Sequence, residues 1–134
     1  MAEETLVKEV LTEDMIRTGA SIIEALDRQN LIVDAALWLY LADTNRWRLM
    51  LASPEVHIDG PRRAYTRLFH AIRNANVHGV SLDNLAVIDS QDPFIQLLRR
   101  AIKTDRVITP PVRFSKNTIN GQFIEDALIY RLAA

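Results

Sequence analysis

The chain has 134 residues, of which 49% are hydrophobic and 25% are charged, so its size suits one globular domain with a single core. It contains no cysteine, which excludes a disulfide scaffold, thiol catalysis and any metal site that needs thiolate ligands. No apolar run approaches the roughly 20 residues that span a bilayer, and the acidic N-terminus does not resemble a secretion signal. We therefore expect a cytoplasmic protein with no membrane contact.

The net charge of −1 conceals an uneven distribution along the chain. Residues 1–59 carry five basic and eleven acidic side chains, whereas residues 60–134 carry eleven basic and six acidic ones. This asymmetry is typical of a protein with an anionic partner. It is also typical of two halves that attract each other within one fold, which is the commoner case.

The first predicted helix follows a short N-terminal segment. Residues 1–11 are expected to be flexible or weakly helical, and residues 12–134 to form a single domain. Thr12 is a suitable N-cap, because its hydroxyl can accept a hydrogen bond from the first helical turn. Apolar residues then recur at helical spacing from Met15 to Leu26, so we predict a helix that ends near Gln29.

A hairpin is predicted next, because residues 31–41 alternate with the period of a strand and residues 46–52 do the same. A three-residue loop at 43–45, with its last residue in the left-handed conformation, would place Leu39 opposite Leu49. One face of this hairpin would then pack in the hydrophobic core. The other face would gather Trp38, Tyr40, Arg48 and Met50.

The middle of the chain alternates helices with one short strand. Gly60 and Pro61 open a second helix, residues 85–88 form a short apolar strand, and Asp92 and Pro93 begin a third helix. Together with the two hairpins, this order predicts an α+β domain with three main helices. Its sheet would be mostly antiparallel, built from two hairpins plus the short strand.

The clearest signal is a second hairpin near the C-terminus. Asn120 and Gly121 suit the positive φ angles of a type I′ turn, which would pair residues 112–119 with residues 122–129. In that register Lys116 and Glu125 form a cross-strand charge pair. The main alternative is a terminal helix, because the apolar residues after residue 122 also suit helical spacing.

Residues 117–127 carry the pattern Asn-x-Ile-Asn-Gly-x-x-Ile-Glu-Asp-Ala. This ending resembles that of small stand-alone bacterial proteins of uncharacterised function, and a looser likeness extends to the strand at residues 35–40. The resemblance implies no activity, so it supplies no functional residues.

Our first hypothesis for function is a protein-interaction or self-associating module. An uncovered face made of Trp38, Tyr40, Arg48 and Met50 has the composition of a protein interface. A protein partner or a second copy of the chain would then cover it. This hypothesis requires Trp38 and Tyr40 to be exposed in the monomer.

A nucleic-acid binder is the alternative. The second and third helices carry basic residues that could neutralise several phosphates if the helices lay side by side. These residues are Arg63, Arg67, Arg99, Arg100 and Lys103. The competing explanation is that cations near helix C-termini stabilise the helix dipole.

A metal-dependent hydrolase or nuclease is the second alternative. Asp89 follows the short strand, where functional groups often lie, and Mg²⁺ would need a second carboxylate such as Asp126 beside it. The three histidines lack the spacing of metal ligands, and the four glycines are too scattered for a phosphate loop or a dinucleotide fingerprint. We therefore expect no cofactor, and most simply no enzyme.

Overall fold

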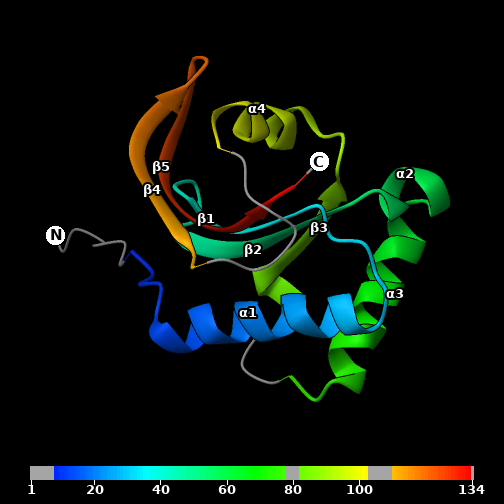
Figure 1. The fold of residues 1–134 in the computed structure, drawn as a ribbon. Helices are drawn as coiled ribbons and strands as arrows, with labels where there is room; N and C mark the ends of the chain where they lie inside the picture. Colours follow the sequence, from blue (N-terminus) through cyan, green and yellow to red (C-terminus); the bar gives the residue numbers. More distant parts are fainter. Residues whose placement is uncertain (1–7, 78–81, 103–109, 134) are drawn as a thin grey trace, which may run out of the picture.

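A computed structural model describes residues 8–77, 82–102 and 110–133, which form a sheet between helices on both faces (Figure 1). The helices are α1 (Glu13–Arg28), α2 (Glu55–Asp59), α3 (Pro61–Asn74) and α4 (Pro93–Ala101), with a short 3₁₀ helix η1 (Leu82–Asn84). The strands are β1 (Ala35–Leu41), β2 (Arg46–Ser53), β3 (Leu85–Asp89), β4 (Val112–Ile119) and β5 (Gln122–Leu132).

The sheet has the strand order β3-β2-β1-β5-β4, and every neighbouring pair is antiparallel except β2 with β3. The parallel pair arises because α2 and α3 carry the chain from the end of β2 back to the start of β3. The predicted α+β class and the mostly antiparallel sheet are confirmed. The structure differs in detail, since the sheet is a five-stranded mixed sheet and the described residues contain four α-helices.

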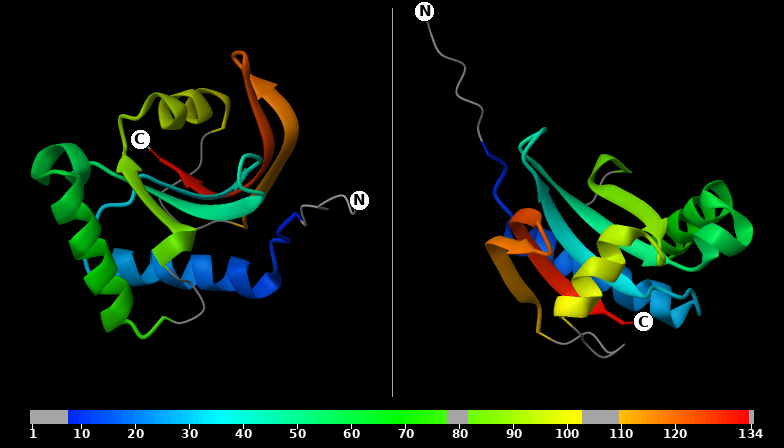
Figure 2. Two further views of the ribbon diagram at one scale, coloured as in Figure 1. Left: turned by 180° about the vertical axis from the view of Figure 1, so that it is seen from behind. Right: turned by 90° about the horizontal axis from the view of Figure 1, so that it is seen from above.

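The two faces of the sheet carry separate apolar cores. The helices α1 and α3 cover one face, and α4 covers the other, as Figure 1 and the views of Figure 2 show. The first core includes Ile22, Leu26, Trp38, Leu49, Leu68 and Tyr130. The second core includes Leu37, Ile95, Leu98, Ala127 and Ile129.

The α1 helix begins as its sequence predicts. The Thr12 hydroxyl accepts a hydrogen bond from the backbone N–H of Met15 at 3.1 Å. Gly19 then allows α1 to approach the sheet closely, because a Cβ atom there would lie 2.5 Å from Tyr130 Oη and 2.8 Å from Trp38 Nε1. The Tyr130 hydroxyl accepts a hydrogen bond from Trp38 Nε1 at 3.1 Å, so the helix packs directly on a bonded aromatic pair.

The first hairpin forms with a register one residue away from the predicted one. Its turn has four residues, 42–45, in place of three, and Asn45 takes the expected positive φ of 54°. Leu39 therefore pairs with Arg48, and Leu49 pairs with Trp38. Because side chains alternate between the two faces of a sheet, a shift of one residue changes which side chains of β1 and β2 share a face.

The predicted interaction face does not form. Trp38 is fully buried and Tyr40 is 6% exposed, both in the core beneath α1. Met50 packs against the core on the opposite face, while Arg48 is exposed and donates a hydrogen bond from Nε to the backbone oxygen of Asp83 at 3.4 Å. The four residues thus do not share one exposed surface, because α1 covers the aromatic pair.

The second hairpin is confirmed. Ile119 pairs with Gln122, and the turn between them has φ angles of 47° at Asn120 and 82° at Gly121, as a type I′ turn requires. The predicted charge pair is absent from the ladder, because Lys116 takes a positive φ of 45° and interrupts the pairing. Glu125 Oε1 instead lies 4.0 Å from Lys8 Nζ.

Residues 8–11 are not helical, and residues 1–7 lie outside the described residues. Glu9 joins this segment to the first hairpin, since its N–H donates to the backbone oxygen of Asn45 at 3.0 Å. Its carboxylate accepts from the N–H of Trp47 at 2.7 Å. Within the described ranges, no helix has the length and the apolar character that crossing a membrane would require.

Candidate functional site

A polar cavity of about 540 Å³ lies where the parallel strands β2 and β3 end. Ser53 and Asp89 are the paired last residues of these strands, so the segments that follow them leave the same edge of the sheet beside α2 and α4 (Figure 1). The carboxyl ends of parallel strands are a common location for ligand sites. The cavity is lined by Asp34, Pro54, His57, Ser90, Gln91, Gln96, Arg99 and Ala133.

His57 and Asp89 form an oriented pair at this cavity. His57 Nδ1 and Asp89 Oδ1 are 2.8 Å apart, and the same carboxylate oxygen accepts from the N–H of Gln91 at 2.9 Å. These two contacts, the Gln91 N–H first, lower the pKa of Asp89 below its usual value despite partial desolvation. An ionised carboxylate can only accept, so His57 Nδ1 donates and the other ring nitrogen remains for a ligand.

Ser90 presents a buried hydroxyl that the fold does not use. Ser90 is 8% exposed, its N–H donates to the oxygen of Ser53 at 3.3 Å, and its carbonyl accepts from Gln96 Nε2 at 2.7 Å. Its backbone is therefore held from both sides. The hydroxyl oxygen is buried and has no hydrogen-bond partner.

Arg99 brings a second unused donor to the same cavity. Its Nη1 donates to Gln96 Oε1 at 3.0 Å, which holds the guanidinium in place. Its Nε is buried and has no hydrogen-bond partner. Gln96 thus holds both Ser90 and Arg99 in place. Beside the cavity, Ser90 Oγ and Arg99 Nε remain without a hydrogen bond.

The adjoining helix α2 is tied to α3 by ion pairs. Arg67 Nη1 lies 2.9 Å from Glu55 Oε1 and 3.7 Å from Asp59 Oδ2. Arg67 was a candidate for nucleic-acid contact, and here its charge is matched by two carboxylates of α2. These pairs hold the short helix that carries His57.

The structure does not bring the predicted basic residues together. Arg63 and Arg67 lie on α3, whereas Arg99 and Arg100 lie on α4, and these helices cover opposite faces of the sheet (Figure 2). Lys103 lies outside the described residues. The described residues therefore do not join the two helices into one basic surface.

The two carboxylates proposed as metal ligands also lie apart. Asp89 is on the edge strand β3 and Asp126 is on β5, so at least three strand spacings, or about 14 Å, separate them. Asp126 accepts two hydrogen bonds of 2.6 Å from Arg113 and one of 2.9 Å from Ser115. In the described ranges, no group of three histidine, aspartate or glutamate side chains could hold a metal ion.

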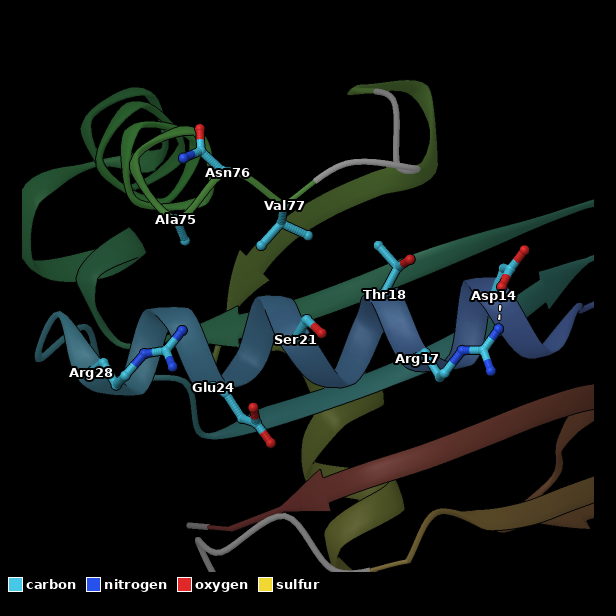
Figure 3. A pocket seen from close by; sticks show the side chains of 9 residues that line it. All are labelled: Asp14, Arg17, Thr18, Ser21, Glu24, Arg28, Ala75, Asn76 and Val77. Atoms are coloured by element: carbon cyan, nitrogen blue, oxygen red, sulfur yellow. Dashed lines mark hydrogen bonds and ion pairs between the residues drawn. The ribbon is translucent and has the colours of Figure 1, made fainter.

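A larger groove of about 690 Å³ lies between the outer face of α1 and residues 75–77 (Figure 3). Its side chains are the polar ones expected on the solvent face of a helix, and Arg17 and Asp14 form an ion pair within it. None of its lining residues has a buried polar atom without a partner. We therefore place the candidate site at the strand ends and not in this groove.

Comparison of the chain with protein-family models, with curated proteins and with solved structures finds no match. The site therefore has to be interpreted from its own chemistry. Sequence reasoning selected Asp89 for its position after a strand and Arg99 for its charge. The structure places Arg99 in the lining of this cavity and Asp89 against His57, which also lines it. It missed His57 and Ser90, although Ser90 directly follows Asp89 and offered the best signal.

Proposed function

We propose that this protein binds a small anionic ligand, with a carboxylate or phosphate group, in the cavity where β2 and β3 end. The observation that carries this proposal is the pair of unused buried donors, Ser90 Oγ and Arg99 Nε, beside one cavity. Neither atom touches water in the unliganded cavity, so ligand oxygens would accept from both after a small rotation of each side chain. The other ring nitrogen of His57, which bonds to none of the described residues, would supply a third polar contact.

The chemistry of the two donors favours an anionic acceptor over a neutral one. A buried donor without a partner costs about 1–3 kcal/mol, and this cost is recovered when an acceptor arrives. Arginine also keeps its charge under all ordinary conditions, and a guanidinium binds carboxylate and phosphate oxygens with strong, directional hydrogen bonds. The volume of about 540 Å³ suits a metabolite-sized molecule.

Isothermal titration with inorganic phosphate, succinate and citrate tests the proposal. We expect at least one of these anions to bind, and Arg99→Gln to weaken its affinity at least about tenfold, as the loss of a charged hydrogen bond implies. Arg100→Gln is the matched control, because Arg100 is the next residue of α4, is exposed and does not line the cavity. Binding of none of the three anions, or equal effects of the two variants, would contradict the proposal.

Salt dependence separates this function from the nucleic-acid alternative. A single anion held in a cavity gives a slope of about −1 or smaller when log affinity is plotted against log salt concentration, whereas a nucleic acid that contacts Z phosphates of a duplex gives about −0.9Z. Titration with a labelled duplex and a labelled single strand at two salt concentrations gives this slope. A steep slope would favour the nucleic-acid alternative instead.

A further inference from the structure

A groove of about 310 Å³, lined mainly by apolar side chains, lies at the other end of β1, away from the cavity at the ends of β2 and β3. Leu39 and Leu41 of β1 line it together with Phe94 from the first turn of α4 and Phe123 from β5. The hairpin of β4 and β5 rises beside α4 at this place (Figures 1 and 2). The groove therefore lies between the hairpin and the helix.

Phe123 is the most exposed of the large hydrophobic residues that line this groove. It is 54% exposed, and it is the aromatic member of the exposed large hydrophobic side chains in the described ranges. Exposed aromatic side chains next to an apolar groove are typical of protein interfaces, where they act as anchors.

The charges around the groove indicate what kind of surface would fit it. Asp43 and Glu125 line the groove, and the described lining includes no basic residue. The same hairpin that carries Phe123 exposes Lys116, two residues from Thr118, which pairs with Phe123. Glu125 belongs to the hairpin itself and already lies 4.0 Å from Lys8 Nζ. No ion pair joins Asp43 to another of the described residues, so the groove offers the Asp43 carboxylate to the exposed Lys116 of a partner.

We propose that a second copy of this chain occupies the groove, with the hairpin of each copy against the groove of the other. Phe123 of one copy then packs on Phe94 and Leu41 of its partner, and Lys116 faces Asp43. A two-fold axis allows this arrangement, since each copy carries both the hairpin and the groove. The groove volume suits one large side chain and is too small for a helix, which favours this occupant.

Sedimentation equilibrium of the full chain tests this proposal. We expect a mass twice the 15.3 kDa of one chain at high concentration. Loading should span about 1 µM to 1 mM, where moderate and weak dimers dissociate. Phe123→Asp should weaken the dimer at least about 30-fold, as loss of a central aromatic anchor does. Ile58→Asp is the control, because Ile58 is 67% exposed on α2 and does not line the groove.

A charge exchange identifies the surface independently of Phe123. Lys116→Glu and Asp43→Lys should each weaken the dimer, and the double variant should recover most of the affinity, because it restores opposite charges across the interface. A chain that stays monomeric over the whole range overturns the proposal. So does a dimer that Phe123→Asp leaves intact, or one in which the double variant is as weak as the single variants.

Discussion

Two buried serines at neighbouring strand ends illustrate how differently the same side chain is used. Ser53 Oγ accepts a hydrogen bond from the N–H of Glu55 at 3.3 Å, so it stabilises the start of α2. Ser90 Oγ is equally enclosed and bonds to no other group of the fold. A buried hydroxyl of this kind lowers stability unless a ligand uses it.

Replacement of these serines separates the two roles. We expect Ser90→Ala to leave the free energy of unfolding unchanged or to raise it by up to about 1 kcal/mol, because no bond within the fold is lost. Ser53→Ala should lower it by about 1 kcal/mol, as loss of one buried hydrogen bond does. Urea unfolding of both variants without added ligand gives the comparison. Equal losses would indicate that the Ser90 hydroxyl is bonded within the fold.

Asp126 in the second hairpin is held by hydrogen bonds from its neighbours. Asp126 is 8% exposed and accepts both hydrogen bonds of the Arg113 fork. The Arg113 side chain, and then Ser115, hold the pKa of Asp126 below its usual value against the effect of burial. Asp126 is thus explained by its partners in the fold, which is why we assign it no catalytic role.

At the scale of elements, two glycines allow the chain to change direction at different places. Gly121 has a φ of 82° in the turn between β4 and β5, and Gly60 has a φ of 89° with a ψ of 153° between α2 and α3. A Cβ atom at either position would meet no atom within 4 Å. Any cost of substitution is therefore conformational.

The two positions should differ in that cost. Gly121→Ala should destabilise the protein by about 1 kcal/mol, because a left-handed conformation is only moderately unfavourable for alanine. Gly60→Ala should cost about 2–3 kcal/mol, because its combination of φ and ψ is essentially restricted to glycine. Urea unfolding measures both values. A Gly60→Ala variant as stable as Gly121→Ala would show that the connection between α2 and α3 adjusts without strain.

At the scale of the whole molecule, Tyr130 joins α1 to the middle of the sheet. Its hydroxyl donates to the backbone oxygen of Ile16 at 2.5 Å and accepts from Trp38 Nε1 at 3.1 Å. Burial raises the pKa of Tyr130 to about 12, and the bond from Trp38 offsets part of this rise. The folded state therefore holds the phenol proton of Tyr130 more tightly than the unfolded chain does.

Alkaline unfolding should reveal this linkage. The folded pKa lies above the value of about 10 in the unfolded chain, so the contribution of Tyr130 is complete below pH 10 and is lost as pH rises towards about 12. We expect the urea midpoint of the parent protein to fall more steeply over this interval than that of Tyr130→Phe, in which the other titrating groups are unchanged. Parallel curves for the two proteins would contradict this assignment.

Much of the local structure could be predicted from the residues themselves. The Thr12 cap, the start of α4 at Pro93 and the turn at Asn120 and Gly121 depend on short-range geometry, so a few neighbouring residues specify them. The first hairpin shows the limit of such reasoning. Its turn holds one more residue than predicted, and that single residue changed every pairing between β1 and β2.

The candidate site could be predicted only in part, because its residues come from distant segments. Asp89 was selected for its place at the end of a strand, yet its partner His57 lies 32 positions away in the sequence. Ser90 and Arg99 meet through Gln96, and no spacing in the sequence indicates that two of their polar atoms lack partners. Burial is a property of the assembled fold, so the sequence alone did not reveal it.

The sequence by itself determined the α+β class, the mostly antiparallel sheet and the second hairpin, since periodicity and turn chemistry act over a few residues. Only the tertiary structure decided which surfaces face water. The α1 helix, which Gly19 allows to lie against Trp38, buries Trp38 and Tyr40, which the sequence had predicted to lie in a protein interface. The parallel pairing of β2 with β3 placed His57, Ser90 and Arg99 around one cavity, because strands that run the same way end at the same edge.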